Sequence, residues 1–152
     1  MPPGADLIPR RLVPHDFDVP DVLEHDRFRL RMLSVTDVTK DFAAINERVR
    51  PDGTPDPWRE TTFLENLADL GWHEVEFKIR RSFAYTVVRP DESEVVGCVY
   101  FVPADDDDYD VEIRMWVTQR AWDEGLDPEL EGAVREWVGR VWPFQRPFWR
   151  DR

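Results

Sequence analysis

Three segments of the chain alternate between apolar and polar residues, which is the pattern of a β-strand with one buried face. They cover residues 27–33, 83–89 and 110–117. Residues 94–102 are apolar at both sets of alternate positions, which indicates a central strand covered on both sides. One further short strand is expected at 145–150. The sequence therefore predicts a sheet whose middle part is a meander of three consecutive strands.

Two stretches before the meander carry apolar residues at helical spacing. The first begins at Ser34, where Asp37 stands three residues later and completes a capping box. The second begins at Thr61 or Thr62 and runs to residue 79, with Gly71 as a local weak point. Its apolar stripe is expected to face the core and consists of Leu64, Leu67, Ala68, Trp72, Val75 and Ile79.

A third helix follows the meander. Asp127 is expected to cap it, and Pro128 occupies the first helical position, where a missing N–H costs little. Its apolar face consists of Leu130, Ala133, Val134, Trp137, Val138 and Val141. The element order is then β-α-α-β-β-β-α-β, which predicts one α/β (α+β) domain with a mostly antiparallel sheet and helices on both faces.

The domain organisation has one further part. Residues 1–25 contain five prolines and are expected to form an extended arm without a helix or a central strand. Residues 26–152 form the domain. We find no signal-peptide pattern and no apolar run of membrane-spanning length, so a cytoplasmic protein without a membrane partner is the default expectation.

Composition narrows the choice of partners. The 152 residues include 20 Lys+Arg and 32 Asp+Glu, which gives a net charge of −12. Such acidity argues against nucleic acid as a partner, because phosphate contacts need clustered basic residues. Cys98 is the only cysteine, so no intrachain disulfide can form. Four consecutive aspartates at 105–108 are interpreted as a solvated turn, and no metal site is predicted.

The third meander strand and the helix after it resemble the GNAT acyltransferase superfamily, and the likeness in element order covers roughly residues 26–150. The matching stretch is residues 111–117, the connection 118–127 and the following helix. In that family the connection holds the pyrophosphate of acetyl-CoA. The resemblance therefore implies a GNAT-like fold, acetyl-CoA as cofactor, and a cofactor site that includes Val117, Gln119, Arg120, Gly125 and Leu126.

This connection departs from the family motif Q/R-x-x-G-x-G/A, of which only Gly125 matches. Asp127 places a carboxylate where the family has a small residue, and several other acidic side chains surround it. A helix N-terminus favours an anion by only about 0.3–1 kcal/mol at an exposed site. Nearby like charges can cancel that gain. We therefore predict that acetyl-CoA binds weakly or not at all.

Glu112 is the candidate catalytic residue, because the resemblance implies a glutamate on this strand that takes a proton from the attacking amine. The alternative is an ion pair of Glu112 with Arg114 or with an arginine of another strand. The family's frequent general acid, a tyrosine on a later helix, has no counterpart after Tyr109. Three tryptophans, Trp58, Trp116 and Trp122, are candidate walls of a substrate pocket, with ordinary packing as their alternative role.

Two functions remain open at this point. One is an N-acetyltransferase-like enzyme that moves an acetyl group from acetyl-CoA to a small-molecule or peptide amine. The other is a GNAT-fold protein that has lost the cofactor site and acts as a ligand-binding or interaction module. In the family, the third meander strand and the next strand splay apart to admit the cofactor, so the state of that gap distinguishes the two.

Overall fold

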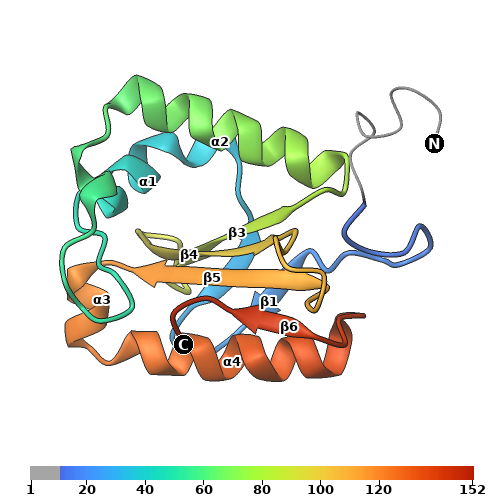
Figure 1. Ribbon diagram of the computed structural model, residues 1–152. Helices are drawn as coiled ribbons and strands as arrows, with labels where there is room; N and C mark the ends of the chain where they lie inside the picture. The colour runs from blue at the N-terminus through green and yellow to red at the C-terminus, as the bar shows by residue number, and fades with distance from the viewer. Residues whose placement is uncertain (1–10) are drawn as a thin grey trace.

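A six-stranded sheet forms the centre of the protein in the computed structural model, which describes residues 11–152 (Figure 1). The strands lie in chain order: β1 (Val22–Glu24), β2 (Arg29–Met32), β3 (Phe83–Val88), β4 (Val95–Val102), β5 (Val111–Val117) and β6 (Pro147–Trp149). Neighbours are antiparallel except β5 and β6, which are parallel. The predicted meander and the mixed α/β fold class are therefore confirmed.

Helices cover both faces of this sheet (Figure 1). On one face lie α1 (Val38–Ile45) and α2 (Phe63–Lys78), preceded by the short 3₁₀ turns η2 (Val35–Asp37) and η3 (Pro57–Glu60). On the other face lies α4 (Leu126–Val141), and the one-turn helix α3 (Gln119–Asp123) joins β5 to it. In β5, the odd-numbered residues pack toward α4, while the side chain of Trp116 packs toward α1.

The predicted helix starts on the first face are confirmed. Ser34 and Asp37 form the capping box, in which each side chain accepts a bond from the other residue's backbone N–H. The Thr62 side chain accepts the Glu65 N–H at 3.1 Å and caps α2. Gly71 does not interrupt α2, which is one continuous helix.

The main core lies between the sheet and α4. The α4 residues Leu130, Val134, Trp137 and Val138 are buried there as predicted, against aromatic residues of β3 and β4. Trp142, directly after the helix, packs against the same group, with its ring 4.6 Å from that of Phe101. This aromatic core packs the sheet against α4 and holds in place the strands that carry the site described below.

The prediction that the apolar stripe of α2 faces the core is wrong. Leu64, Trp72, Val75 and Ile79 are between 45% and 74% exposed, while Leu70 and the polar residues Asn66 and Glu76 are the buried positions of α2. The physical reason lies in a polar contact: the Asn66 side-chain amide donates to the buried carboxylate of Asp41 on α1 at 2.8 Å. This pairing, together with the packing of Leu70 against Leu33 and Ala84, places that side of α2 against the domain.

The part of the predicted arm that the structure describes is fastened to the domain; residues 1–10 lie outside the described region. The Leu12 N–H donates to the Arg80 carbonyl at 3.0 Å, and the Tyr85 hydroxyl donates to the Pro20 carbonyl at 2.6 Å. Residues Val22–Glu24 add an edge strand beside β2. The arm therefore extends the sheet.

The acidic turn at 105–108 is exposed. Asp110, next to it, accepts the backbone N–H groups of Gln145 and Arg146 at 2.7 and 3.1 Å, which fixes the start of β6. Within residues 11–152 no cluster of three or more His, Cys, Asp or Glu side chains suited to a metal ion is present. Over the same range no helix is long and apolar enough to cross a membrane.

Candidate functional site

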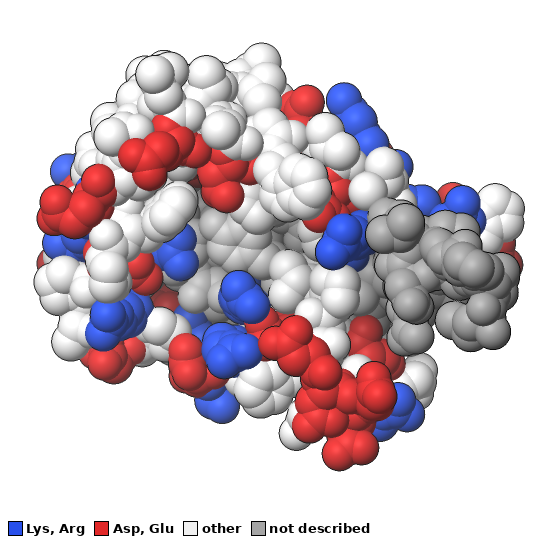
Figure 2. Space-filling view, turned by 45° about the horizontal axis from the view of Figure 1, so that its top comes forward, with Lys and Arg blue, Asp and Glu red and all other residues white. Residues whose placement is uncertain are grey.

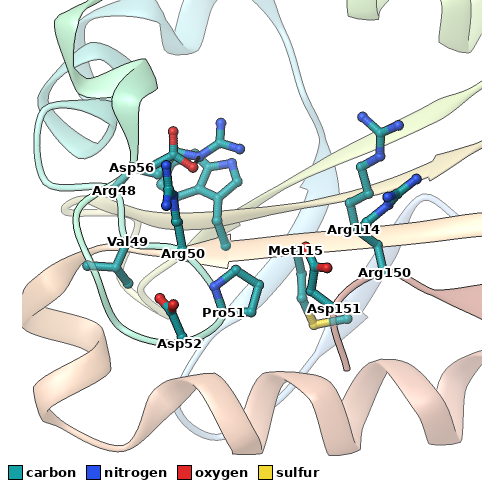
Figure 3. Close-up of a pocket in the computed structure, with 11 residues that line it drawn as sticks. Arg48, Val49, Arg50, Pro51, Asp52, Asp56, Arg114, Met115, Arg150 and Asp151 are labelled. Atoms are coloured by element: carbon teal, nitrogen blue, oxygen red, sulfur yellow. Dashed lines mark ion pairs between the residues drawn. The ribbon is translucent and has the colours of Figure 1, made fainter.

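A cleft of about 760 Å³ opens beside the second half of β5. Figure 2 shows this face of the molecule hollowed, with basic side chains gathered around the hollow. In Figure 3, Arg48 and Arg50 lie with Asp56 at one end, while Arg114 and Arg150 lie close together at the other. The lining is completed by Val49, Pro51, Asp52, Met115, Trp116 and Asp151.

A smaller pocket of about 260 Å³ adjoins the cleft on the α2 side and shares Arg48, Arg114, Met115 and Trp116 with it. Its other walls are Trp58, Asp69, His73, Tyr100 and Val102. Of the three tryptophans predicted to form a pocket, the structure brings Trp58 and Trp116 together here. Trp122 lines neither cavity; its ring packs against the turn at Gly53.

Trp116 is held in place from two sides. Its indole N–H donates to the Tyr100 hydroxyl at 3.0 Å, and the Arg48 guanidinium lies 5.1 Å from its ring centre. Arg48 also forms an ion pair with Asp56 at 3.2 Å. Burial raises the pKa of Tyr100, so its hydroxyl stays neutral and able to accept that bond. The shared wall of the two pockets is therefore a fixed surface.

Glu112 is buried, with 3% of its side chain exposed, and it lies between two arginines. The Arg114 Nε donates to one carboxylate oxygen, and an Arg150 amino group donates to the other at 2.5 Å. Burial alone would raise the pKa of Glu112, but the hydrogen bonds and charges of Arg150 and Arg114 outweigh it and lower that pKa. The ion pair with Arg114, the alternative role for Glu112, is thus present, and a carboxylate held ionised in this way is a weak proton acceptor.

The structure adds a titratable pair that sequence reasoning missed. His73 Nε2 lies 3.3 Å from an Asp69 oxygen, and both side chains line the smaller pocket. The two residues stand four apart on α2, which is the spacing that places side chains on one helix face. That spacing was the available signal, but it became informative only once this face of α2 was seen to border a cavity.

Three backbone carbonyl groups along the edge of β5 that faces β6 already accept hydrogen bonds from other parts of the protein. The Ile113 carbonyl accepts from the Arg150 N–H at 3.0 Å, and the Val117 carbonyl accepts from the Val49 N–H at 3.1 Å. Between them, the Met115 carbonyl accepts from the Arg152 side chain at 3.3 Å. The two strands diverge after Trp149, and the gap between them is bridged by protein groups.

Arg152 fills that gap and ties β5 to the start of α4. Its guanidinium donates to Asp127 at 2.6 and 2.9 Å and to Glu131 at 3.1 Å, and only 5% of its side chain is exposed. The prediction that Asp127 caps this helix is therefore wrong. The helix begins at Leu126 with Gly125 as its N-cap, because Gly125 adopts a φ of 78° that favours glycine, and the Asp127 side chain is taken by Arg152.

The model of the GNAT acetyltransferase domain family matches residues 27–149, which is most of the chain. The chain belongs to the GNAT family. No curated protein sequence matches it at a significant level. The parallel pair β5–β6 and the connection from β5 to α4 are the elements at which the resemblance implied the cofactor site.

Solved structures of other GNAT proteins share the fold at low sequence identity. A Bordetella pertussis protein assigned to the GNAT acetyltransferases is 20% identical, with a TM-score of 0.64 over 80% of this chain and 74% of that one. A ribosomal-protein-S5-alanine acetyltransferase from Vibrio fischeri is 14% identical, with a TM-score of 0.58 over 89% and 77%. A ribosomal L7/L12 α-N-protein acetyltransferase in complex with coenzyme A is 13% identical, with a TM-score of 0.54 over 78% and 68%.

In this GNAT chain the predicted cofactor loop is folded into the helical turn α3. The Gln119 N–H donates to the Glu47 carbonyl at 2.7 Å, and the N–H groups of Ala121 and Trp122 donate to Thr118. The Gln119 side chain donates to Asp123, and Arg120 pairs with Glu94 at 3.5 Å. Val117 and Leu126 are fully buried in the core, while Gly125 is exposed with open space beside it.

Acetyl-CoA fits these residues poorly. A pyrophosphate group needs unpaired N–H donors and a favourable potential, but at least three N–H groups of this loop already have protein partners. The exposed carboxylates of Asp123 and Glu124 at the end of α3 add negative charge to this loop. The hydrogen bond from Arg89 lowers the pKa of Glu124 by more than burial raises it. Glu124 therefore remains ionised.

Proposed function

We propose that this GNAT-fold chain is a ligand-binding module whose cofactor gap has been closed, and that its remaining cleft takes a small ligand. The bridge formed by Arg152 across β5, Asp127 and Glu131 carries this proposal. It fills part of the gap beyond the end of β6, while the cleft between β5 and the residues Arg150 and Asp151 stays open at about 760 Å³.

The chemistry of the open cavities favours a ligand with both an amine and an anionic group. The guanidinium groups of Arg114 and Arg150 share the single carboxylate of Glu112, and their side chains are 52% and 43% exposed. Paired guanidiniums suit a ligand carboxylate. Asp69, in the smaller pocket with Arg114, offers a carboxylate to an amine, and Trp58 and Trp116 offer aromatic faces to it. An amino acid or the end of a peptide meets both demands.

The cofactor part is tested by calorimetric titration of the full chain with acetyl-CoA. We expect no saturable heat at micromolar ligand, whereas a coenzyme-A-binding GNAT protein in the same buffer gives a full isotherm. Saturable micromolar binding of acetyl-CoA to this chain would contradict the proposal.

The ligand part is tested by thermal shift with a panel of free amino acids and dipeptides. We expect some of them to raise the melting temperature of the wild type, and Arg114→Gln and Asp69→Asn each to abolish that rise. Arg140→Gln on α4 is the matched control, since Arg140 is exposed, pairs with the exposed Glu136 at 3.8 Å and lines neither pocket. Equal shifts in all four proteins would refute this assignment.

Acetyl transfer to an amine is the second candidate, because the His73–Asp69 pair faces the pocket that adjoins β5. A histidine whose ring is oriented by a carboxylate can act as a general base toward an amine. On this alternative, release of free coenzyme A from acetyl-CoA depends on an added amine and is lost in His73→Gln. Glu112→Gln distinguishes the two candidate bases, since activity that survives this change excludes Glu112 as the base.

A further inference from the structure

One basic side chain of the cleft beside β5 has no partner within the part of the chain that the structure describes. Every other arginine and lysine side chain of residues 11–152 takes part in a hydrogen bond or an ion pair, whereas none is found for Arg50. Arg50 is exposed and lines the cleft. Acidic residues outnumber basic ones by 32 to 20 in this chain, so an unpaired arginine is unusual in it. Its guanidinium is available to an incoming carboxylate.

The backbone that carries Arg50 is fixed on both sides. The Arg50 N–H donates to the Thr54 carbonyl, and the Arg50 carbonyl accepts from the Gly53 N–H, both at 2.8 Å. Before it, Val49 is 1% exposed and its N–H donates to β5. After it, the Trp122 ring packs against Gly53. The guanidinium therefore extends from an ordered turn, and a ligand does not have to order this loop in order to bind.

The carboxylates at the same end of the cleft are already engaged. Asp52 accepts two hydrogen bonds within its own turn, at 2.9 and 2.6 Å, and in Figure 3 its carboxylate lies apart from the Arg50 guanidinium. Asp56 accepts the Trp58 N–H at 2.7 Å and pairs with Arg48 at 3.2 Å. Arg48 has no other polar partner among residues 11–152. The groups without a protein partner at this end are therefore guanidinium donors.

The two basic ends of the cleft are within reach of one small molecule. Arg114 and Trp116 stand two residues apart on β5, which corresponds to about 7 Å along the strand. Arg48 lies 5.1 Å from the centre of the Trp116 ring, and Arg50 lies at the same end of the cleft (Figure 3). The volume of about 760 Å³ is in the usual range of small-molecule sites. A ligand of dipeptide size can therefore place one anionic group at each end.

We propose that Arg50, together with Arg48, is a second anion subsite that makes the cleft selective for an acidic side chain. This inference rests on the proposed function, in which Arg114 and Arg150 take the carboxylate of the ligand. Guanidinium groups are planar donors that match the geometry of a carboxylate. The ligand class then narrows to an amino acid or a peptide end with a second carboxylate, such as a C-terminal glutamate.

Calorimetric titration of the full chain with two dipeptides of equal size tests this proposal. Glycyl-glutamate and glycyl-glutamine differ only in a side-chain carboxylate against a neutral amide, so their comparison isolates the second subsite. We expect the wild type to bind glycyl-glutamate about tenfold more tightly, because a charge-assisted hydrogen bond is stronger than a neutral one. In Arg50→Gln this preference should disappear, while the affinity for glycyl-glutamine stays at the wild-type value.

Arg140→Gln is the matched control for overall charge. It removes the same charge from an exposed position that lines neither pocket, and it should keep the full preference for glycyl-glutamate. Circular dichroism checks that each variant is folded. Equal loss of the preference in Arg50→Gln and Arg140→Gln assigns the effect to the net charge of the protein and overturns the subsite.

A charge reversal at the same position tests the sign of the effect. Arg50→Glu should bind glycyl-lysine more tightly than glycyl-glutamate, which is the opposite of the order expected for the wild type. A preference for glycyl-glutamate that survives in Arg50→Glu overturns the role of Arg50.

The two dipeptides also separate this inference from the proposed function on which it rests. Equal affinity of the wild type for glycyl-glutamate and glycyl-glutamine overturns the second subsite and leaves the proposed function standing. Absence of binding of both dipeptides overturns the proposed function itself, and this inference with it.

Discussion

The guanidinium of Arg152 and the carboxylate of Asp127 form a two-point hydrogen bond, with N···O distances of 2.6 and 2.9 Å and both side chains less than 10% exposed. Paired donors and acceptors of this geometry are among the stronger polar contacts in proteins. Removing one partner leaves the other charge buried without compensation. The bond therefore sets both the stability of this end of the sheet and the closure of the cofactor gap.

Arg152→Ala should lower the free energy of unfolding by roughly 3–5 kcal/mol, because Asp127 loses its counter-charge in a buried setting. Urea denaturation at neutral pH measures this loss. The double variant Arg152→Ala with Asp127→Asn should recover part of it. The control is Arg140→Ala, which removes an exposed pair with Glu136 at 3.8 Å and should change stability by no more than about 0.5 kcal/mol. Equal losses in both single variants would contradict this account.

Asp41→Asn should make the protein more stable at neutral pH. Burial raises the pKa of Asp41 to about 6 from 3.8, although the Asn66 amide opposes the rise. The native state therefore retains this proton at pH values where the unfolded chain has lost it. Stability from this group is fully present below about pH 4 and falls as the pH rises through about 6, by roughly 2–3 kcal/mol.

The measurement for Asp41 is the unfolding free energy of both proteins between pH 4 and pH 8. The advantage of Asp41→Asn over the wild type should grow by this amount across that range and then level off. Asp107→Asn, in the exposed acidic turn, serves as the control and should show no comparable growth. A constant difference between Asp41→Asn and the wild type would rule out the titration.

Cys98 should resist thiol reagents in the folded protein. It is buried in β4, and burial raises the pKa of its thiol, so little thiolate exists at neutral pH. We expect a chromogenic disulfide reagent to label it slowly in buffer and rapidly, with one thiol per chain, in denaturing urea. Rapid labelling of the native protein would show that β4 is accessible from solvent.

Two glycine substitutions should change stability in opposite directions. A Cβ at Gly97 in β4 would lie 2.3 Å from the Trp116 carbonyl oxygen of β5, so Gly97→Ala should cost at least about 2 kcal/mol. A Cβ at Gly132 meets no atom within 4 Å, and the residue lies inside α4. Gly132→Ala should therefore gain about 0.5–1 kcal/mol. Thermal unfolding of the two variants checks both signs, and a loss in Gly132→Ala would be inconsistent with an open helix surface.

Local patterns in the sequence predicted the elements whose determinants are local. The capping box of Ser34 and Asp37, the meander and the apolar face of α4 each depend on residues within one element or its neighbours. Periodicity located the stripe on α2 as well, but it does not say which side of a helix meets the sheet. That choice depended on the pairing of Asn66 with Asp41, residues 25 positions apart.

The site was harder to predict because its decisive contacts join distant segments. The cap at Asp127 was the reasonable choice from its neighbours, and it failed because Arg152 takes that carboxylate from beyond the helix. Glu112 was placed on the correct strand, yet the arginine on the other side of it, Arg150, follows a different strand. Trp58 and Trp116 were recognisable as wall residues by their size, whereas the His73–Asp69 pair needed a view of the cavity.

Within residues 11–152, both edges of the sheet are formed by strands of only three residues, β1 and β6. Strand β6 begins with a proline, which has no N–H to donate. Short edges of this kind offer few unpaired backbone groups to another chain, which protects a protein from aggregation by strand addition. Crowded or concentrated samples should accordingly resist fibrous precipitation.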